Sequence, residues 1–174
     1  TFRDPDTYLY MREYKKKLMI GIFEPDAKNA FNKTNKVPEN FSFGEFKVEK
    51  SYVNMLHKLA SKRVPEINEL KIEKYFSGPE SFTPDTNYLL GETAEIKNFF
   101  VCCGFNSIGI GSGGGAGKAV AELMIKGHAT EDLFSLDIKR FEKFNSSLKF
   151  IKERVTESLG NLFKMHWPYK QLTT

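Results

Sequence analysis

Hydrophobic and polar residues alternate near the start of the chain, as they do in a β-strand with one buried face. Residues 7–14 (TYLYMREY) follow this alternation, and residues 18–23 (LMIGIF) form a second short apolar run. Lys15, Lys16 and Lys17 separate the two runs. The pattern predicts a β-hairpin with the lysines in its turn.

Helical periodicity follows over residues 48–62. The apolar positions with this spacing are Val48, Tyr52, Met55, Leu56 and Leu59. Polar residues fill the opposite face, and Pro65 closes the segment. Residues 24–40, before the helix, have no periodicity and are predicted to be a long loop.

The second half of the chain mixes short apolar runs with helical patterns. Strands are predicted at residues 70–76 and 88–90, and a buried strand is predicted at residues 99–103. Residues 78–85 (GPESFTPD) contain two prolines and are predicted to form a structured turn. A final amphipathic helix is predicted over residues 146–162, and Trp167-Pro168 then ends the fold or begins a linker.

Glycine is concentrated in one stretch, because six of the twelve residues from 104 to 115 are glycines. A helix is predicted over residues 116–126, with Gly127 as its C-terminal cap. Glycines allow positive φ angles and close approach of a ligand to the backbone, and a helix start offers free N–H groups and a partial positive charge. Such a turn suits a phosphate or the electron-rich pyrimidine edge of a flavin.

Two standard nucleotide-binding motifs fit this stretch poorly. A phosphate-binding P-loop fails twice, because Ser112 replaces its first glycine and Ala119 replaces its Ser/Thr. The GxGxxG pattern is matched literally by Gly109, Gly111 and Gly114. That fingerprint needs a hydrophobic strand ending in an acidic residue about 20 positions later, and residues 130–141 are too charged for it. A glycine-rich packing turn without a ligand remains an alternative.

Charge and composition narrow the function classes. The chain has 174 residues, 40% hydrophobic and 28% charged, which is ordinary for a soluble globular protein. The net charge of +4 is not clustered, so a nucleic-acid partner is not expected. No apolar run reaches the ~18–20 residues that a membrane span needs, so no membrane partner is expected either.

The cysteines and histidines form no recognisable ligand set. Cys102 and Cys103 are adjacent, so on a strand they point to opposite faces, and they are expected to be small buried residues in a reducing compartment. The histidines, His57, His128 and His166, show no pairing pattern and are expected at the surface. No metal site is predicted.

Several segments, in this order, carry a family resemblance: GPESFTPD, LLGE, FFVCCGFNSIGI, GGGAGK and DLFSLDIKRF. They resemble the end of the flavin domain in D-amino-acid-oxidase-type FAD-dependent oxidoreductases, in the branch of sarcosine dehydrogenase, dimethylglycine dehydrogenase and the pyruvate dehydrogenase phosphatase regulatory subunit. RDPDTYLYMRE and LMIGIFEP resemble the substrate-domain hairpin of this family, and MHWPYKQ resembles its junction with a folate-binding domain.

The resemblance implies an α+β (α/β) fold, the C-terminal part of a D-amino-acid-oxidase-like FAD-binding fold with an antiparallel substrate-domain sheet. Residues 1–164 would belong to the oxidoreductase domain, with about 1–75 as the substrate roof and 76–145 as the return to the FAD domain. Residues 165–174 would be a linker toward a folate-binding domain. The chain opens at Thr1 and lacks the family's N-terminal nucleotide fingerprint, so it is expected to be a fragment that is inactive alone.

The resemblance also implies a site. The residues expected to contact the flavin are Gly104, Phe105, Asn106, Ser107, Ile108, Gly109 and Ile110, together with Thr83 and Pro84. Asn106 and Ser107 would also lie near the substrate. Tyr10 and Arg12 are candidates for binding the substrate carboxylate, and a surface pair on a strand is their alternative interpretation. No catalytic residue is assigned.

The implied reaction is hydride transfer from an N-methyl carbon of sarcosine or dimethylglycine to N5 of FAD, with tetrahydrofolate in the folate-binding domain capturing the one-carbon unit. The implied partners are an electron-transfer flavoprotein or the catalytic subunit of pyruvate dehydrogenase phosphatase. The implied location is the mitochondrial matrix, or the cytoplasm for a bacterial protein. Two alternatives remain open: a regulatory flavoprotein without turnover, and a degenerate product with structural remnants only.

Overall fold

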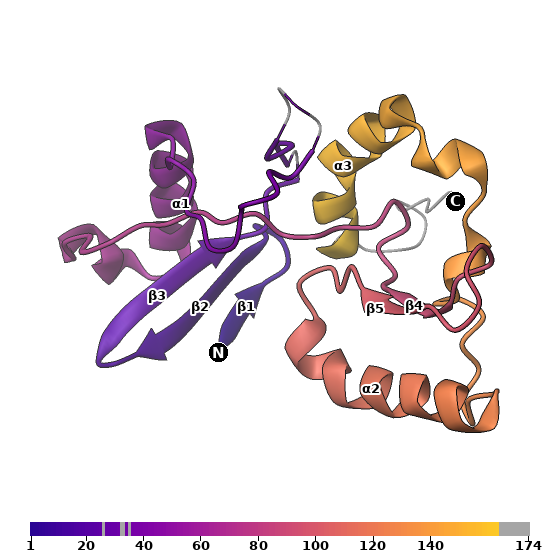
Figure 1. Cartoon of the computed structure of the whole chain (residues 1–174). Helices are drawn as coiled ribbons and strands as arrows, with labels where there is room; N and C mark the ends of the chain where they lie inside the picture. Colours follow the sequence, from indigo (N-terminus) through magenta and orange to yellow (C-terminus); the bar gives the residue numbers. More distant parts are fainter. Residues whose placement is uncertain (26, 32–33, 35, 164–174) are drawn as a thin grey trace. The chain divides into compact units, whose positions relative to one another are not determined.

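The structure is a computed structural model that describes residues 1–25, 27–31, 34 and 36–163, and the chain divides into two units (Figure 1). The first unit consists of Thr1–Pro25 and Ala30–Pro79, and the second consists of Asp26–Asn29 and Glu80–Thr174. Each unit has its own antiparallel strands, helices and apolar core, and each is described by itself. Antiparallel strands combined with separate helices confirm the predicted α+β class.

The sheet of the first unit has the order β1-β2-β3, formed by β1 (Phe2–Asp4), β2 (Leu9–Tyr14) and β3 (Lys17–Ile22). β2 and β3 pair antiparallel, which confirms the predicted hairpin. Its turn places Lys15 and Lys16 at φ angles of 52° and 61°, whereas Lys17, also predicted in the turn, is the first residue of β3. The short strand β1 was not predicted from the sequence.

The predicted helix at residues 48–62 is α1 (Lys50–Arg63), and the 3-10 helix η1 (Pro65–Glu69) follows it. α1 packs against one face of the sheet (Figure 1). The core between them contains Leu9, Met11, Ala60 and Ile67, with Ile20, Ile22, Leu56, Leu59 and Val64 around it. Because side chains alternate along a strand, the next positions of β2 face away from this core.

A buried carboxylate joins β1 to the C-terminal end of α1. Arg63 Nε donates to Asp4 Oδ2 at 2.6 Å, and Arg63 Nη2 donates to Asp4 Oδ1 at 3.1 Å. The Thr7 hydroxyl also donates to Asp4 Oδ2, at 2.6 Å. The hydrogen bonds from Arg63 and then from Thr7 lower the pKa of Asp4, so the carboxylate is ionised in the folded protein.

The strand predicted at residues 70–76 is wrong. This segment is extended but pairs with no strand in the described part of the chain, and the bridge between Phe46 and Ser77 lies beyond its end. Its large apolar side chains, Leu70, Ile72, Tyr75 and Phe76, are all exposed. An apolar run becomes a strand only where a neighbouring strand satisfies its backbone. The predicted loop at residues 24–40 is confirmed for the residues described within it.

The second unit contains an antiparallel pair, β4 (Leu89–Glu92) and β5 (Phe100–Cys103), and the helices α2 (Gly109–Lys126) and α3 (Leu148–Phe163). Two 3-10 helices, η2 (Ile138–Arg140) and η3 (Lys143–Ser146), precede α3. α2 packs against β4 and β5 (Figure 1). Ala116 and Ala119 of α2 and Leu90 of β4 form the buried core of this unit. The positions of the predicted strands at residues 88–90 and 99–103 and of the final helix are confirmed within about two residues. The prediction that the strand at residues 99–103 is buried is wrong, because β5 is half-buried over its first two residues and exposed over its last two.

The loop before α2 is shorter than predicted. The helix begins at Gly109, whereas the sequence predicted its start at residue 116. Glycine is a poor helix former, so the sequence alone places the helix start later. Packing of the alanine face of α2 on β4 compensates for this weak propensity. The open side of the helix carries five glycines at which an added Cβ would meet nothing within 4 Å, namely Gly111, Gly113, Gly114, Gly115 and Gly117. Gly127 ends the helix in the left-handed conformation, as predicted.

The expectation that the two cysteines are buried is wrong. Cys102 and Cys103 are free and exposed at the end of β5, which pairs with β4. Partial burial, and then the neighbouring Cys103 thiol, raise the pKa of Cys102 above its ordinary value. The thiol is therefore protonated at neutral pH.

The C-terminal predictions cannot be placed. The linker at residues 165–174, with His166, Trp167 and Pro168, lies outside the described residues.

None of the described helices combines the length and the hydrophobicity that crossing a membrane would require.

Candidate functional site

A left-handed turn connects β5 to α2. Gly104, Asn106 and Ser107 have φ angles of 67°, 50° and 67°. A Cβ added at Gly104 would lie 2.9 Å from Thr83 Cγ2, closer than real side chains approach. Glycine is therefore required at this position both by the backbone conformation and by the neighbouring chain.

Asn106 ties this turn to the segment around Thr83. Asn106 is 1% exposed, and its Oδ1 accepts a hydrogen bond from the Thr83 backbone N–H at 2.9 Å. Its Nδ2 donates to the Gly104 carbonyl at 2.6 Å, and its backbone N–H donates to the Ser81 carbonyl at 3.2 Å. The amide of Asn106 therefore holds two chain segments together, and its expected place near the substrate stays a prediction.

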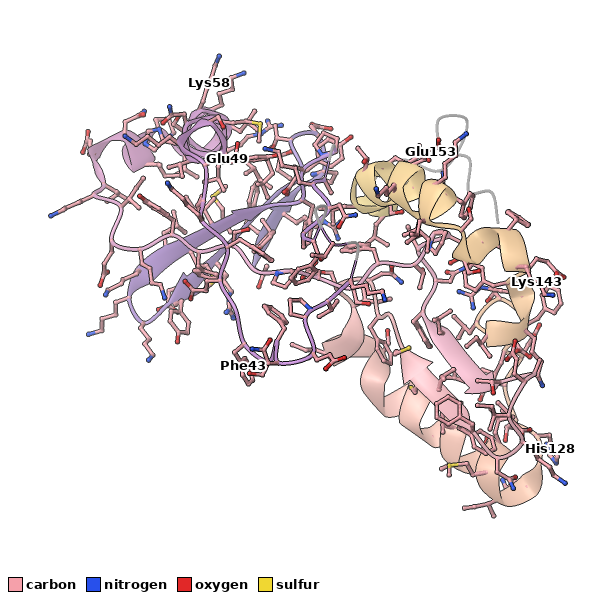
Figure 2. All side chains as sticks on the ribbon, turned by 45° about the horizontal axis from the view of Figure 1, so that its top comes forward. Phe43, Glu49, Lys58, His128, Lys143 and Glu153 are labelled. Carbon is pink, nitrogen blue, oxygen red and sulfur yellow. The ribbon has the colours of Figure 1, made fainter. Side chains whose placement is uncertain are left out.

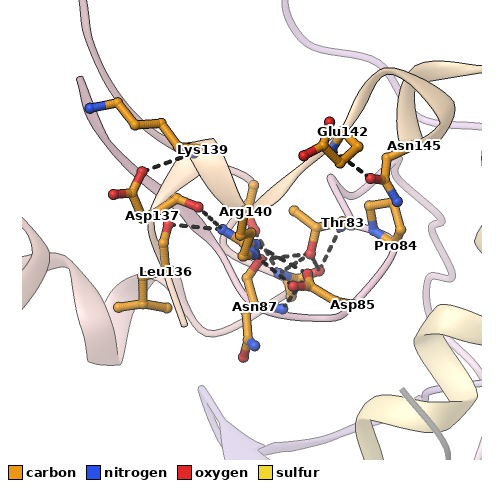
Figure 3. Close-up of polar contacts among 12 residues, drawn as sticks. Thr83, Pro84, Asp85, Asn87, Leu136, Asp137, Lys139, Arg140, Glu142 and Asn145 are labelled. Carbon is orange, nitrogen blue, oxygen red and sulfur yellow. Dashed lines mark hydrogen bonds and ion pairs between the residues drawn. The ribbon is translucent and has the colours of Figure 1, made fainter. Parts of the chain in front are cut away.

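Arg140 holds the other side of the same segment (Figure 3). Its Nε and Nη2 donate to the two carboxylate oxygens of Asp85, at 2.7 and 3.1 Å. Its remaining donors bind the carbonyls of Asn87 at 2.8 Å, Leu136 at 2.8 Å and Asp137 at 3.0 Å. The Asp85 side chain is buried, at 4% exposure, and the Arg140 side chain is 10% exposed. The planar fork of an arginine makes such a set of bonds possible.

A second arginine, from α3, binds the same turn. Arg154 Nη2 and Nε donate to the Pro84 carbonyl at 2.8 and 3.2 Å, and Arg154 also pairs with Glu157. The Thr83 hydroxyl closes the turn from within by donating to the Asn87 carbonyl at 2.7 Å. The two residues predicted to lie near the flavin, Thr83 and Pro84, thus sit in a turn that is held from both sides.

Phe105 faces the core of the unit. Its ring stacks on Tyr88 with centroids 4.8 Å apart, and it belongs to the apolar cluster around Leu90 and the alanines of α2. The Phe105 carbonyl accepts a hydrogen bond from the Ile108 N–H at 3.0 Å, so both the side chain and the carbonyl have partners within the unit. The flavin contact predicted for Phe105 stays a prediction.

The start of α2 carries hydrogen-bond donors without helical acceptors. The N–H groups of Gly109 and Ile110 lie in the first turn, where a helix provides no acceptor, and the cap residue Ile108 supplies no side-chain bond. The first turn also contains no acidic residue. The side chains of Ile108, which precedes these donors, and of Ile110, which carries one of them, are exposed. Such donors suit a negatively charged group, because a helix start carries a partial positive charge.

Glu80 and Ser107 form a polar pair beside the helix start. The Ser107 hydroxyl lies 2.7 Å from each of the two carboxylate oxygens of Glu80. Both residues are exposed. Sequence reasoning singled out Ser107 but missed Glu80, although the glutamate lies inside the quoted GPESFTPD segment.

Tyr10 and Arg12 share the face of β2 that points away from α1. The Tyr10 ring packs over Gly21, where an added Cβ would lie 2.0 Å from Tyr10 Cζ, and it contacts Phe23. Arg12 is exposed, with its guanidinium over the Tyr14 ring at 5.5 Å. This pair belongs to the first unit, so its predicted role in substrate binding stays a prediction.

Other candidate chemistry is sparse in the described residues. They contain no group of three His, Cys, Asp or Glu side chains arranged to hold a metal ion. His128, just after α2, is exposed at the surface as expected (Figure 2). His57 on α1 is half-buried.

Comparison with known families identifies the class. The family model for FAD dependent oxidoreductases matches residues 1–123, and the chain belongs to this family. A model for the FAD dependent oxidoreductase central domain matches residues 126–174. The fold is thus that of a D-amino-acid-oxidase-like FAD-binding fragment, as the sequence predicted. The boundary between the two matches falls near the C-terminal end of α2.

Individual relatives are similar along nearly the whole chain. The chain is 37% identical over 173 residues to 4-methylaminobutanoate oxidase (formaldehyde-forming) of Paenarthrobacter nicotinovorans, covering 99% of this chain and 21% of the relative. It is 34% identical to mitochondrial sarcosine dehydrogenase of Mus musculus, covering 97% of this chain and 18% of the relative. It is 32% identical to the mitochondrial pyruvate dehydrogenase phosphatase regulatory subunit of Mus musculus, covering 97% of this chain and 19% of the relative. The chain thus spans about a fifth of the length of these relatives.

Proposed function

We propose that the complete protein carrying this chain oxidises the N-methyl group of a small amino carboxylate. The chain belongs to the FAD-dependent oxidoreductases, and three relatives are named for 4-methylaminobutanoate, sarcosine and dimethylglycine. These compounds share an N-methylated amine and a carboxylate. Sarcosine and dimethylglycine are the substrates we expect first, and 4-methylaminobutanoate belongs to the same chemical class.

The observation that carries the proposal is the uncapped start of α2 beside the left-handed turn. FAD, when bound, supplies a hydride acceptor at the flavin N5 atom. The proposed role of residues 104–110 is to present backbone N–H groups and the helix start to the N1/O2 edge of the ring. Donors fixed in place before the reaction stabilise the negative charge that develops there.

Thr83 and Pro84 complete the proposed flavin contact, because Asn106 ties their turn to residues 104–107. Arg140 and Arg154 hold the same turn through Asp85 and the Pro84 carbonyl. Tyr10 and Arg12 are proposed to bind the substrate carboxylate. The guanidinium of Arg12 is exposed and offers the paired donors that a carboxylate prefers. Tetrahydrofolate and an electron-transfer flavoprotein are proposed as the further cofactor and partner of the complete protein.

A second candidate is a flavoprotein that turns nothing over and regulates pyruvate dehydrogenase phosphatase. The identity of 32% to that regulatory subunit over 97% of the chain supports it. The catalytic subunit of the phosphatase would then be the partner. The mitochondrial relatives support a location in the mitochondrial matrix, and the bacterial relative supports the cytoplasm for a bacterial protein.

The test is an absorption spectrum of the purified full-length gene product, followed by anaerobic addition of sarcosine, dimethylglycine or 4-methylaminobutanoate. We expect a flavin band that bleaches with at least one of these compounds. Glycine, which has no N-methyl group, is the matched control and should leave the band unchanged. A flavin band that resists all three compounds would favour the regulatory candidate, and absence of any flavin would overturn the proposed site.

A further inference from the structure

We propose that Glu80, held by Ser107, binds the cationic amine of the substrate and so selects amines over neutral analogues. This inference rests on the proposed function, since it assigns a substrate-binding residue to that site.

The position of the pair is fixed by the backbone around it. Ser107 adopts a left-handed φ angle of 67° immediately before the N-terminal cap of α2. The adjacent Asn106 binds the backbone at Ser81 and Thr83, so the two short segments that carry Glu80 and Ser107 run together. The distance of 2.7 Å between the Ser107 hydroxyl and each Glu80 oxygen follows from this arrangement.

The charge of Glu80 is not neutralised by a cation. Among the described residues, the ion pairs involve other carboxylates, and none includes Glu80. Asp85, five positions later, shows the contrast, because it is buried and fully paired with Arg140. One hydroxyl satisfies only part of the acceptor capacity of a carboxylate, which can accept about four hydrogen bonds. Glu80 is therefore an exposed anion with free acceptor positions.

The expected ligand is the complement of this group. A substrate with an N-methylated amine is a cation at neutral pH, as alkylamines are, and it carries N–H donors. An ammonium–carboxylate hydrogen bond is charge-assisted and stronger than a neutral one. The Ser107 hydroxyl lies 2.7 Å from both oxygens of Glu80 but has one proton to donate, so most acceptor positions of the carboxylate are left for a ligand. The pair would thus hold the amine, while the carboxylate of the substrate is bound elsewhere.

A structural role is the competing explanation. The glutamate could serve only to hold Ser107, or to place negative charge near the start of α2. Glu80→Gln separates these roles, because the amide oxygen of glutamine still accepts the hydrogen bond from Ser107 while the charge is lost. Ser107→Ala makes the reverse change by keeping the charge and removing the orienting hydroxyl.

The experiment compares two ligands that differ at the amine. Sarcosine and methoxyacetate have nearly the same shape, but an uncharged ether replaces the ammonium group in methoxyacetate. Anaerobic calorimetric titration of the full-length flavoprotein measures Kd for each. We expect Glu80→Gln to raise Kd for sarcosine about 10- to 100-fold, the range expected for a hydrogen bond to a charged group. Kd for methoxyacetate should stay within about threefold, and Ser107→Ala should raise Kd for sarcosine by a smaller factor.

Glu95→Gln removes the same charge from an exposed position of the same unit and should change neither Kd. The visible flavin spectrum checks that each variant retains its cofactor. If Glu80→Gln leaves the ratio of the two Kd values unchanged while sarcosine still bleaches the flavin, the role of Glu80 is overturned and the proposed function stands. If none of the N-methyl compounds bleaches the wild-type flavin, the proposed function is overturned, and amine recognition by Glu80 with it.

Discussion

Arg140 binds both carboxylate oxygens of Asp85 from a position 55 residues further along the chain. The Asp85 side chain is buried and that of Arg140 is only 10% exposed, and Arg140 also donates to three backbone carbonyls. Removing one partner would leave a charge in the interior without its counter-ion. We therefore expect Asp85→Asn to lower the free energy of unfolding by about 3–5 kcal/mol, measured by urea denaturation of the full-length protein.

The matched control for this prediction is Glu157→Gln. Glu157 also pairs with a buried arginine, Arg154, but its own side chain is 52% exposed. Exposed ion pairs contribute about 0–1 kcal/mol, so this variant should behave nearly as the wild type. An Asp85→Asn variant that is no less stable than Glu157→Gln would show that the buried pair does not hold the turn.

Asn106→Ala tests the junction between the turn and residues 81–83. The substitution leaves the Thr83 N–H and the Gly104 carbonyl without their partner and places alanine at a φ angle of 50°. The two effects together should cost about 3–5 kcal/mol in unfolding free energy. Asn98→Ala is the control, because Asn98 has a similar φ angle of 63° but is exposed. Asn98→Ala should lower the free energy of unfolding only by the cost of alanine in a left-handed conformation, about 1–2 kcal/mol. Equal losses for the two variants would contradict the role given to the Asn106 amide.

Substitution by alanine should have opposite effects on stability at two glycines of the stretch from residue 104 to 115. Gly104→Ala meets both a φ angle of 67° and Thr83 Cγ2 at 2.9 Å, so we expect a loss of about 1–3 kcal/mol. Gly113→Ala lies in α2 with nothing near the added Cβ, and alanine is the better helix former. It should raise stability by about 0.5–1 kcal/mol, as followed by thermal unfolding. A destabilising Gly113→Ala would show that another part of the complete protein packs closely on this side of the helix.

Glu122 should make stability depend on acid pH. Hydrogen bonds from the Thr130 backbone and hydroxyl, and then the nearby Lys126, lower the pKa of Glu122 to about 2. The pKa of Glu122 is lower in the folded protein than in the unfolded chain. Ionised Glu122 therefore stabilises the fold fully above about pH 4.5, and this stabilisation is lost as the pH falls toward about 2. Glu122→Gln should therefore be less stable than the wild type at neutral pH, and the difference should shrink across this acid range.

Urea unfolding at several pH values measures this difference. Glu131→Gln is the control, since Glu131 is 71% exposed and only approaches Lys118 at 3.8 Å. Surface substitutions of this kind change stability by about 0.5 kcal/mol or less. A difference between wild type and Glu122→Gln that stays constant from neutral pH to about pH 2 would disprove the assigned pKa shift.

Local patterns sufficed for much of the fold. Alternation over β2 and β3 predicted the hairpin, and helical spacing predicted α1 and α3. The start of α2 was predicted too late because helix propensity argues against glycine, whereas packing of Ala116 and Ala119 decides the outcome. The apolar run at residues 70–76 resembled a strand, but no strand in the described part of the chain pairs with it.

The candidate site was less predictable than the fold. Motif reasoning reached Asn106 and Thr83 as site residues, but not the bond between them. Arg140 and Arg154 lie in charged stretches that resemble an ordinary solvated surface, and nothing local shows that they are buried partners of Asp85 and Pro84. Such contacts depend on tertiary structure, because the partners are 55 and 70 residues apart in sequence.

The two arginines also determine how this protein could be recombined with its relatives. The two family matches meet between residues 123 and 126, which suggests a place to join parts of different family members. Yet Arg140 and Arg154 lie on one side of this boundary, and the turn at Asp85 and Pro84 lies on the other. A chimera joined there would combine a turn from one parent with arginines from the other. A working chimera must therefore take three parts from the same parent, although they are far apart in sequence: residues 83–87, Arg140 and Arg154.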